Sequence, residues 1–192
     1  MLAPRSLLLT VMLMALTLVA GTAPAAKQEQ TADIEIELVE SRLENAVYTV
    51  DATVVFDLGA DVLEALGSGV PVTLEIEIDV QQPRELMWNK TVYSLYQRYQ
   101  ITYHALSDQY LLTNLTTQIS TSFPTPRAAL QALGQVRHLP LIDQHLLQPD
   151  QEYLAQMRVS IVISELPAPL KLWAVLQSDW RAKSNWYVWQ LQ

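Results

Sequence analysis

Hydrophobic and polar side chains alternate along much of the chain after residue 32, and this period of two predicts β-strands. The clearest case runs from Val70 to Val80, where every second residue is Val, Leu or Ile and where Glu75, Glu77 and Asp79 lie between them. A strand with this pattern has one face on a core and the other in water. We expect strands over the following ranges: 33–38, 46–56, 70–80, 88–104, 109–121, 153–163 and 186–191.

Other segments carry apolar residues at helical spacing. Asp57 precedes an apolar face over residues 58–66 and Gly67 follows it, which predicts a helix capped by Asp57 and ended by Gly67 in the left-handed conformation. The Thr-Pro pair at 125–126 predicts a second helix start, because proline is tolerated at the first helical position. A third short helix is expected over 170–177.

The order of these elements favours one antiparallel, mainly β (α+β) domain. No series of strand, helix and strand recurs, so this order disfavours the alternative of a doubly wound parallel sheet. We expect a single β-sandwich-like or curved-sheet domain of seven or eight strands with two or three short helices. The segment that holds Pro140 and Pro149 is predicted to be a linker.

Acidic side chains recur at every second position in two of the predicted strands. Asp33, Glu35 and Glu37 form one triplet, and residues 75–79 hold the other. Like charges directly opposite each other destabilise a sheet, so the two strands should not pair with their acidic triplets opposite each other. We expect a triplet to lie beside the strand of Arg98 or that of Arg158, or at a sheet edge, where charge discourages aggregation.

The N-terminus has the pattern of a secretory leader. Arg5 precedes an apolar run over residues 7–20, and the small residues at 23–25 suit a signal peptidase. The run is shorter than the roughly 20 residues that span a bilayer. We expect residues 1–25 to be a signal peptide and 26–192 to be a single β-rich periplasmic domain of a Gram-negative bacterium; the alternative is an uncleaved anchor.

Composition excludes several chemistries. The 192 residues contain no cysteine, which removes thiol nucleophiles, disulfides and thiolate metal sites. The formal net charge of −8 disfavours nucleic acid. The three histidines, at 104, 138 and 145, lack the spacing that places two ligands on one helix face. We therefore expect no metal, no cofactor and no catalytic residues.

The C-terminal tail is the best candidate for binding. It mixes tryptophans with basic residues, and Trp180, Arg181 and Trp186 are the predicted binding residues, since such a mixture can stack on sugar rings or hold an anion. The alternative is that these aromatics seal the edge of the core. His104, next to Ser107-Asp108, is expected to shape a turn by a hydrogen bond rather than to catalyse.

Several short motifs resemble one family. They are Trp88, residues 103–110, Phe123 before Ala129-Leu130, Leu166-Pro167-x-Pro169-Leu170, and Asp179-Trp180 with Ser184-x-Trp186. Together they are similar to the proteobacterial domain-of-unknown-function family 4390, which consists of exported proteins of about this length. Its genes often lie beside those of a sensor histidine kinase and a ribosomal-RNA methyltransferase. The resemblance implies an envelope setting and a sensor histidine kinase as a possible partner, and it supplies no catalytic residues.

The chemistries that composition excludes and the family resemblance point to the same class of function. We expect a non-catalytic periplasmic accessory or binding module linked to a membrane sensor kinase, with no membrane span after signal cleavage. The alternative is a periplasmic hydrolase that acts on cell-wall material, which requires a pocket with carboxylates or a serine of perturbed pKa.

Overall fold

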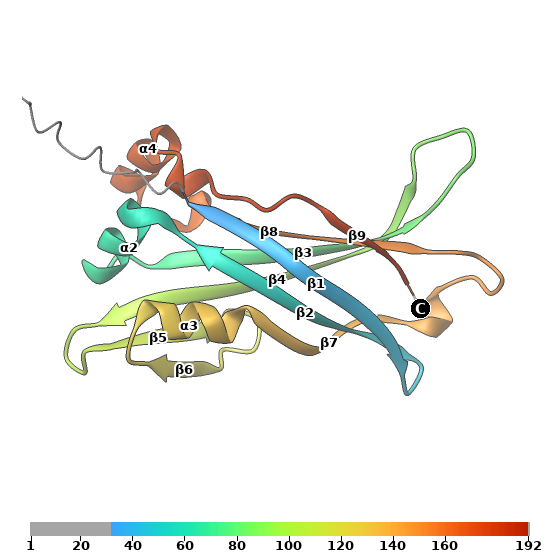
Figure 1. Cartoon of the computed structure of the whole chain (residues 1–192), viewed down its shortest axis with the longest axis horizontal. Helices are drawn as coiled ribbons and strands as arrows, with labels where there is room; N and C mark the ends of the chain where they lie inside the picture. The colour runs from blue at the N-terminus through green and yellow to red at the C-terminus, as the bar shows by residue number, and fades with distance from the viewer. Residues whose placement is uncertain (1–31, 192) are drawn as a thin grey trace, which may run out of the picture.

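The computed structural model describes residues 32–191, which form two antiparallel sheets that do not close into a barrel (Figure 1). The predicted mainly β, α+β class is confirmed. The signal peptide predicted at 1–25 lies outside the described residues.

In the described part the strands are β1(Asp33–Glu44), β2(Val47–Asp57), β3(Val72–Gln82), β4(Lys90–His104), β5(Gln109–Asn114), β6(Ser120–Phe123), β7(Gln135–Asp143), β8(Leu154–Ile161) and β9(Tyr187–Gln190). The α-helices are α2(Gly59–Gly67), α3(Pro126–Leu133) and α4(Ala168–Leu176), and short 3-10 turns are η1(Gln144–Leu146), η2(Ile163–Glu165) and η3(Asp179–Arg181).

The larger sheet has the order β6-β5-β4-β3-β8-β9. Its centre is regular: β3 pairs with β4 without interruption from Val72↔Ile101 to Val80↔Tyr93, and with β8 from Leu74↔Ile161 to Gln81↔Leu154. Strict alternation in β3 therefore places its aliphatic residues inside and its acidic residues outside. The period-two pattern predicted this part of the fold correctly.

The smaller sheet has the order β1-β2-β7 and is irregular. A register shift between Ile36 and Leu38 turns Leu38 outward, where it is 47% exposed, and places Val39 in the core. In the sequence, Ile34, Ile36 and Leu38 alternate with the acidic triplet, which predicts Leu38 on the buried face. This prediction is wrong beyond the bulge. Two more shifts interrupt the pairing of β2 with β7.

β7 corrects the prediction of a linker around Pro140. The residue lies inside the strand and faces Thr49, next to a register shift. Proline removes a ladder donor, so it is tolerated at an edge strand or a bulge, and β7 is an edge strand. The segment around Pro149 is indeed a loop. This missed strand, together with the division of 109–121 into β5 and β6, brings the described residues to nine strands instead of seven or eight.

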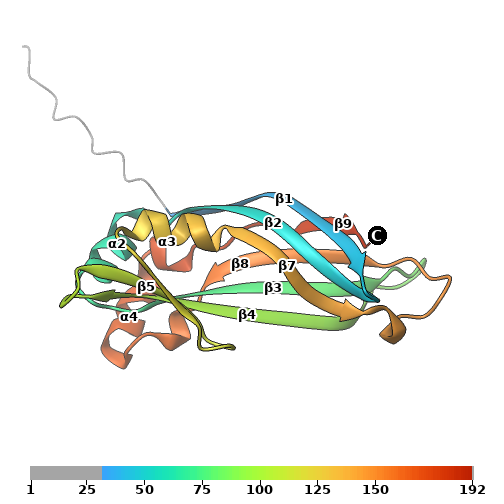
Figure 2. The same cartoon turned by 90° about the horizontal axis from the view of Figure 1, so that it is seen from below.

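The core lies between the two sheets. Figure 2 shows β1, β2 and β7 as one layer and β8, β3 and β4 as the other, with α3 extending the first layer over β5. The largest fully buried side chains include Leu58, Leu74, Ile78, Met157 and Trp180. No helix within residues 32–191 is long and apolar enough to cross a membrane.

Two helix ends differ in detail from their predictions. Asp57 Oδ1 accepts the Gly59 N–H at 3.3 Å, but α2 begins only at Gly59 and its N-cap position is Leu58. The left-handed residue after α2 is Gly69, with φ of +87°, and not Gly67. Thr125 caps α3 as expected, since its hydroxyl accepts the Ala128 N–H at 3.1 Å.

Candidate functional site

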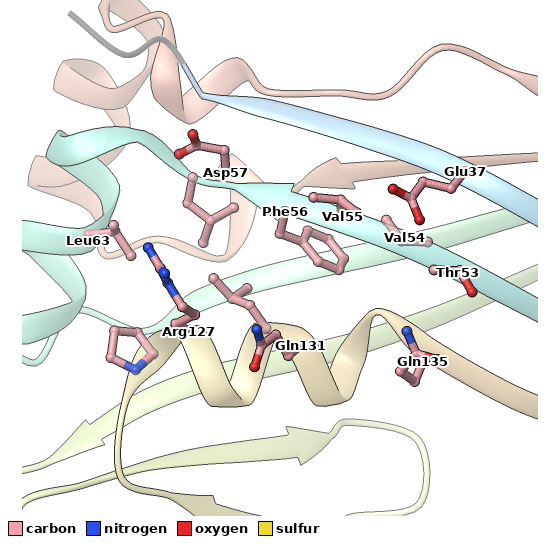
Figure 3. A pocket seen from close by; sticks show the side chains of 13 residues that line it. Glu37, Thr53, Val54, Val55, Phe56, Asp57, Leu63, Arg127, Gln131 and Gln135 are labelled. Carbon is pink, nitrogen blue, oxygen red and sulfur yellow. The ribbon is translucent and has the colours of Figure 1, made fainter.

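A groove of about 840 Å³ lies where β2 ends, between that strand and the helices α2 and α3 (Figure 3). This volume is in the range of small-ligand sites, roughly 300–1,000 Å³. Most of its walls are apolar, from Val55, Phe56, Leu63 and Leu130. Its polar groups are the side chains of Glu37, Thr53, Asp57, Arg127, Gln131 and Gln135.

The groove exists because β7 is shorter than the strand it pairs with. The register of β2 with β7 ends at Thr53↔Gln135, and the chain before that point is the helix α3. Gly134 joins the two elements, and a Cβ atom at this position would lie 2.1 Å from the Val54 carbonyl oxygen. Only glycine therefore lets α3 end so close to β2.

Beyond Gly134, the edge of β2 is unpaired. The Val54 N–H donates to the Gly134 carbonyl at 2.9 Å, so the backbone groups of Val54 face away from β1. Backbone polarity alternates along an antiparallel strand, so the N–H and C=O of Phe56 face the same side, toward the groove. In the described part of the chain no hydrogen bond joins these two groups to α3.

One cation enters the groove. Arg127 extends from the first turn of α3 toward the end of β2, near Leu63 and Asp57 (Figure 3). Its side chain is exposed, and none of the ion pairs among residues 32–191 includes it. Glu37, at the β1 bulge, lies toward the opposite end. The groove thus has Arg127 and Asp57 at one end of an apolar wall and Glu37 at the other.

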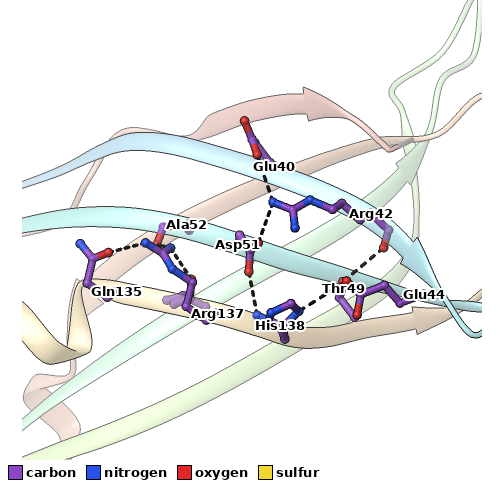
Figure 4. Close-up of polar contacts among 10 residues, drawn as sticks. Glu40, Arg42, Glu44, Thr49, Asp51, Ala52, Gln135, Arg137 and His138 are labelled. Carbon is purple, nitrogen blue, oxygen red and sulfur yellow. Dashed lines mark hydrogen bonds and ion pairs between the residues drawn. The ribbon is translucent and has the colours of Figure 1, made fainter.

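A second group of polar side chains covers the outer face of the small sheet (Figure 4). Asp51 accepts the backbone N–H of His138 at 2.7 Å and pairs with Arg42 at 3.0 Å. His138 has a φ of +47°, and its ring Nδ1 lies 3.4 Å from Glu44. The hydrogen bond from His138 is the largest cause that lowers the pKa of Asp51, and the Arg42 charge adds to it. This network holds the β2–β7 bulge in place.

The three predicted binding residues have different environments in the structure. Trp180, in η3, is 1% exposed and belongs to the core, as the alternative role of these aromatics predicts. Arg181 is exposed beside it. Trp186 lies half-buried on the outer face of the large sheet, with the Arg158 guanidinium 4.2 Å from its ring centre. Binding by Arg181 and Trp186 stays a prediction.

The acidic triplets lie as expected. Glu75 pairs with Arg98 at 2.6 Å and Glu77 with Arg158 at 2.5 Å, both across neighbouring strands. The other triplet, from Asp33 to Glu37, is exposed on the edge strand β1. The two triplets lie in different sheets, so they do not pair with each other.

The histidines do not form a reactive cluster. His104 Nδ1 lies 3.0 Å from the Ser107 hydroxyl in the exposed β4–β5 turn, which confirms the expected turn hydrogen bond. His145 contacts Asp143 at 2.8 Å, and His138 belongs to the bulge network. Within residues 32–191 no three His, Asp or Glu side chains gather in a geometry that could hold a metal ion.

Sequence reasoning did not identify the groove. Its walls come from segments far apart in the chain. The sequence around Pro140 predicts a linker in place of β7, whose first residue, Gln135, lines the groove. The one available signal was Thr125-Pro126, which correctly located the start of α3 and so the position of Arg127.

Comparison with known protein families finds a match: residues 31–190 match the family described as domain of unknown function (DUF4390). The match covers nearly the whole chain, so the protein belongs to this family, as its motifs suggested. No curated protein and no solved structure matches the chain.

Proposed function

We propose that this protein is an exported, non-catalytic binding module of the bacterial envelope, and that the groove between β2, α2 and α3 is its ligand site. The observation that carries the proposal is the unpaired edge of β2 inside an apolar groove with a free cation, Arg127. The leader pattern of residues 1–25 supports export, and the periplasm is the proposed location.

The composition of the groove favours binding over hydrolysis. Its lining offers one hydroxyl, from Thr53, and no histidine that could act as a general base for it. The Asp57 carboxylate already accepts the Gly59 N–H. Glu37 lies at the far end from Arg127 (Figure 3). The groove lining therefore does not place an acid and a base close to a common reacting atom.

The proposed partner is an envelope protein, with a membrane sensor histidine kinase as the leading candidate. The gene neighbourhood of the family supports this choice. Binding modules of this kind present one shaped groove to a segment of the partner, and they need no cofactor. Arg181 and Trp186, which do not line the groove, remain a second proposed contact with such a partner.

Site-specific photo-crosslinking in living cells tests the proposal. A photoreactive residue at Gln131, in the groove, should capture a discrete envelope component, and the same residue at Leu106, which is 95% exposed in the β4–β5 turn, should not. A third position, Arg181, reports on the tail. Capture at Leu106 alone, or turnover of cell-wall substrates by the purified protein that groove substitutions abolish, would contradict a non-catalytic groove.

A further inference from the structure

The free backbone groups of Phe56 define what the groove can bind. We propose, on the basis of the function proposed above, that it takes an extended peptide segment of a partner protein. The peptide pairs as an added strand with the edge of β2 at Phe56 and places a carboxylate on Arg127.

The edge of β2 beyond β7 has free backbone groups that an added strand can pair with. β7 occupies this edge as far as Thr53 and stops, so an added strand would continue along the line that β7 leaves at Gly134. The helix α3, which flanks the same edge, cannot substitute for a strand, because its own backbone groups bond within the helix. A peptide in extended conformation supplies both a donor and an acceptor to Phe56.

Other edges of the two sheets are less suited to the same task. The edge of β1 carries the exposed carboxylates of Asp33, Glu35 and Glu37, which repel incoming strands and are a common protection of edges. β6 and β9, at the two edges of the large sheet, are only four residues long. The β2 edge is flanked by apolar side chains instead, with Leu63 38% and Val55 47% exposed.

The charges in the groove fix the chemistry and direction of the peptide. Arg127 lies near the end of β2 and has donors for a carboxylate, whereas Glu37 lies toward the other end (Figure 3). A bound peptide should therefore carry its acidic group at the Arg127 end and tolerate a basic group at the Glu37 end. The carboxylate can come from an acidic side chain or from a free C-terminus, since both offer the same two oxygens.

The test uses the protein purified after export of the full chain, with phage-displayed random dodecapeptides as the probe. Enriched peptides should share an acidic position and bind about tenfold more weakly to Arg127→Glu, since a charge-assisted hydrogen bond is lost and a repulsion gained. Arg84→Glu, in the exposed β3–β4 loop, is the matched control and should leave binding unchanged. Replacing the acidic residue by its amide, or amidating the C-terminus, identifies which carboxylate Arg127 binds.

Backbone pairing needs its own measurement. N-methylation at alternate peptide positions should abolish binding in one register and leave it intact in the other, and the Phe56 amide should gain protection from hydrogen exchange when peptide is bound. Enriched peptides that tolerate methylation in both registers, or leave Phe56 unprotected, would overturn strand addition. Peptides that bind Arg127→Glu as well as wild type would overturn the carboxylate contact. If Gln131 still captures an envelope component in that case, the binding function stands and the ligand is of another chemistry; if it captures none, both proposals fail.

Discussion

The two sheets differ in how regularly their strands pair. In the six-stranded sheet, β3 pairs with β8 without a register shift and with β4 with one shift, after Val80. Arg98 and Arg158, on the neighbouring strands, pair with Glu75 and Glu77 of β3. The three-stranded sheet has three register shifts, a proline in β7 and a helix where the end of β7 would be. The regular centre of the large sheet leaves no gap between its strands, whereas the interrupted small sheet leaves part of the β2 edge unpaired beside a groove. Irregularity is thus the feature that creates the candidate site.

The largest expected difference between the sheets concerns buried aliphatic residues. Ile78→Ala removes a fully buried side chain from β3 and should lower the free energy of unfolding by about 2–5 kcal/mol. Leu38→Ala, at the β1 bulge, should cost less than about 1 kcal/mol because the side chain is 47% exposed. Urea unfolding of both variants makes the comparison. Equal losses would mean that the bulge is absent and that β1 follows simple alternation.

The junction of α3 and β7 should tolerate no side chain. Gly134→Ala places a methyl group 2.1 Å from the Val54 carbonyl oxygen, so the junction must shift, at a cost of about 1–3 kcal/mol. Gly67→Ala is the matched control, because a Cβ there meets nothing within 4 Å. Thermal unfolding of the two alanine variants should separate them. A Gly134→Ala protein as stable as Gly67→Ala would contradict the close approach of α3 to β2.

The ion pairs on the large sheet should contribute less to stability the more exposed they are. The Arg158 side chain is 26% exposed and touches both Glu77 and Trp186, and Arg158→Ala should cost about 1–2 kcal/mol. Arg98, whose side chain is 47% exposed, should cost at most about 1 kcal/mol when replaced by alanine. Chemical denaturation at low and high salt measures both. A larger loss for Arg98 would reverse the proposed ranking of the two pairs.

The bulge network of the small sheet should give a small pH effect. The pKa of Asp51 is lowered below 3.8 in the folded protein, mainly by the His138 N–H, so its ionised form stabilises the fold above that pH. This contribution, less than about 1 kcal/mol at the surface, is lost as the pH falls through the folded pKa. Asp51→Asn should therefore be less stable than wild type at pH 7 and similar to it at the acid end. Parallel pH profiles for the two proteins would exclude this role for Asp51.

Sequence patterns located most of the elements. Period-two alternation found β3, β4 and β8, and the acidic positions of β3 correctly implied basic neighbours. Thr125-Pro126 located α3 because capping and proline preferences depend on residues close in the chain. Each of these features depends on local rules, which a single sequence expresses directly.

What the sequence determined alone was the class: a mainly β, cysteine-free, acidic chain with strict alternation at its centre. Tertiary structure alone decided the bulge that turned Leu38 outward, the pairing that made a strand of the Pro140 segment, and the burial of Trp180. It also decided that β7 would stop short of Phe56 and leave the groove beside Arg127. The physical reason is that strand register and the covering of sheet edges depend on partners distant in the chain. No local propensity specifies where one strand extends beyond its neighbour.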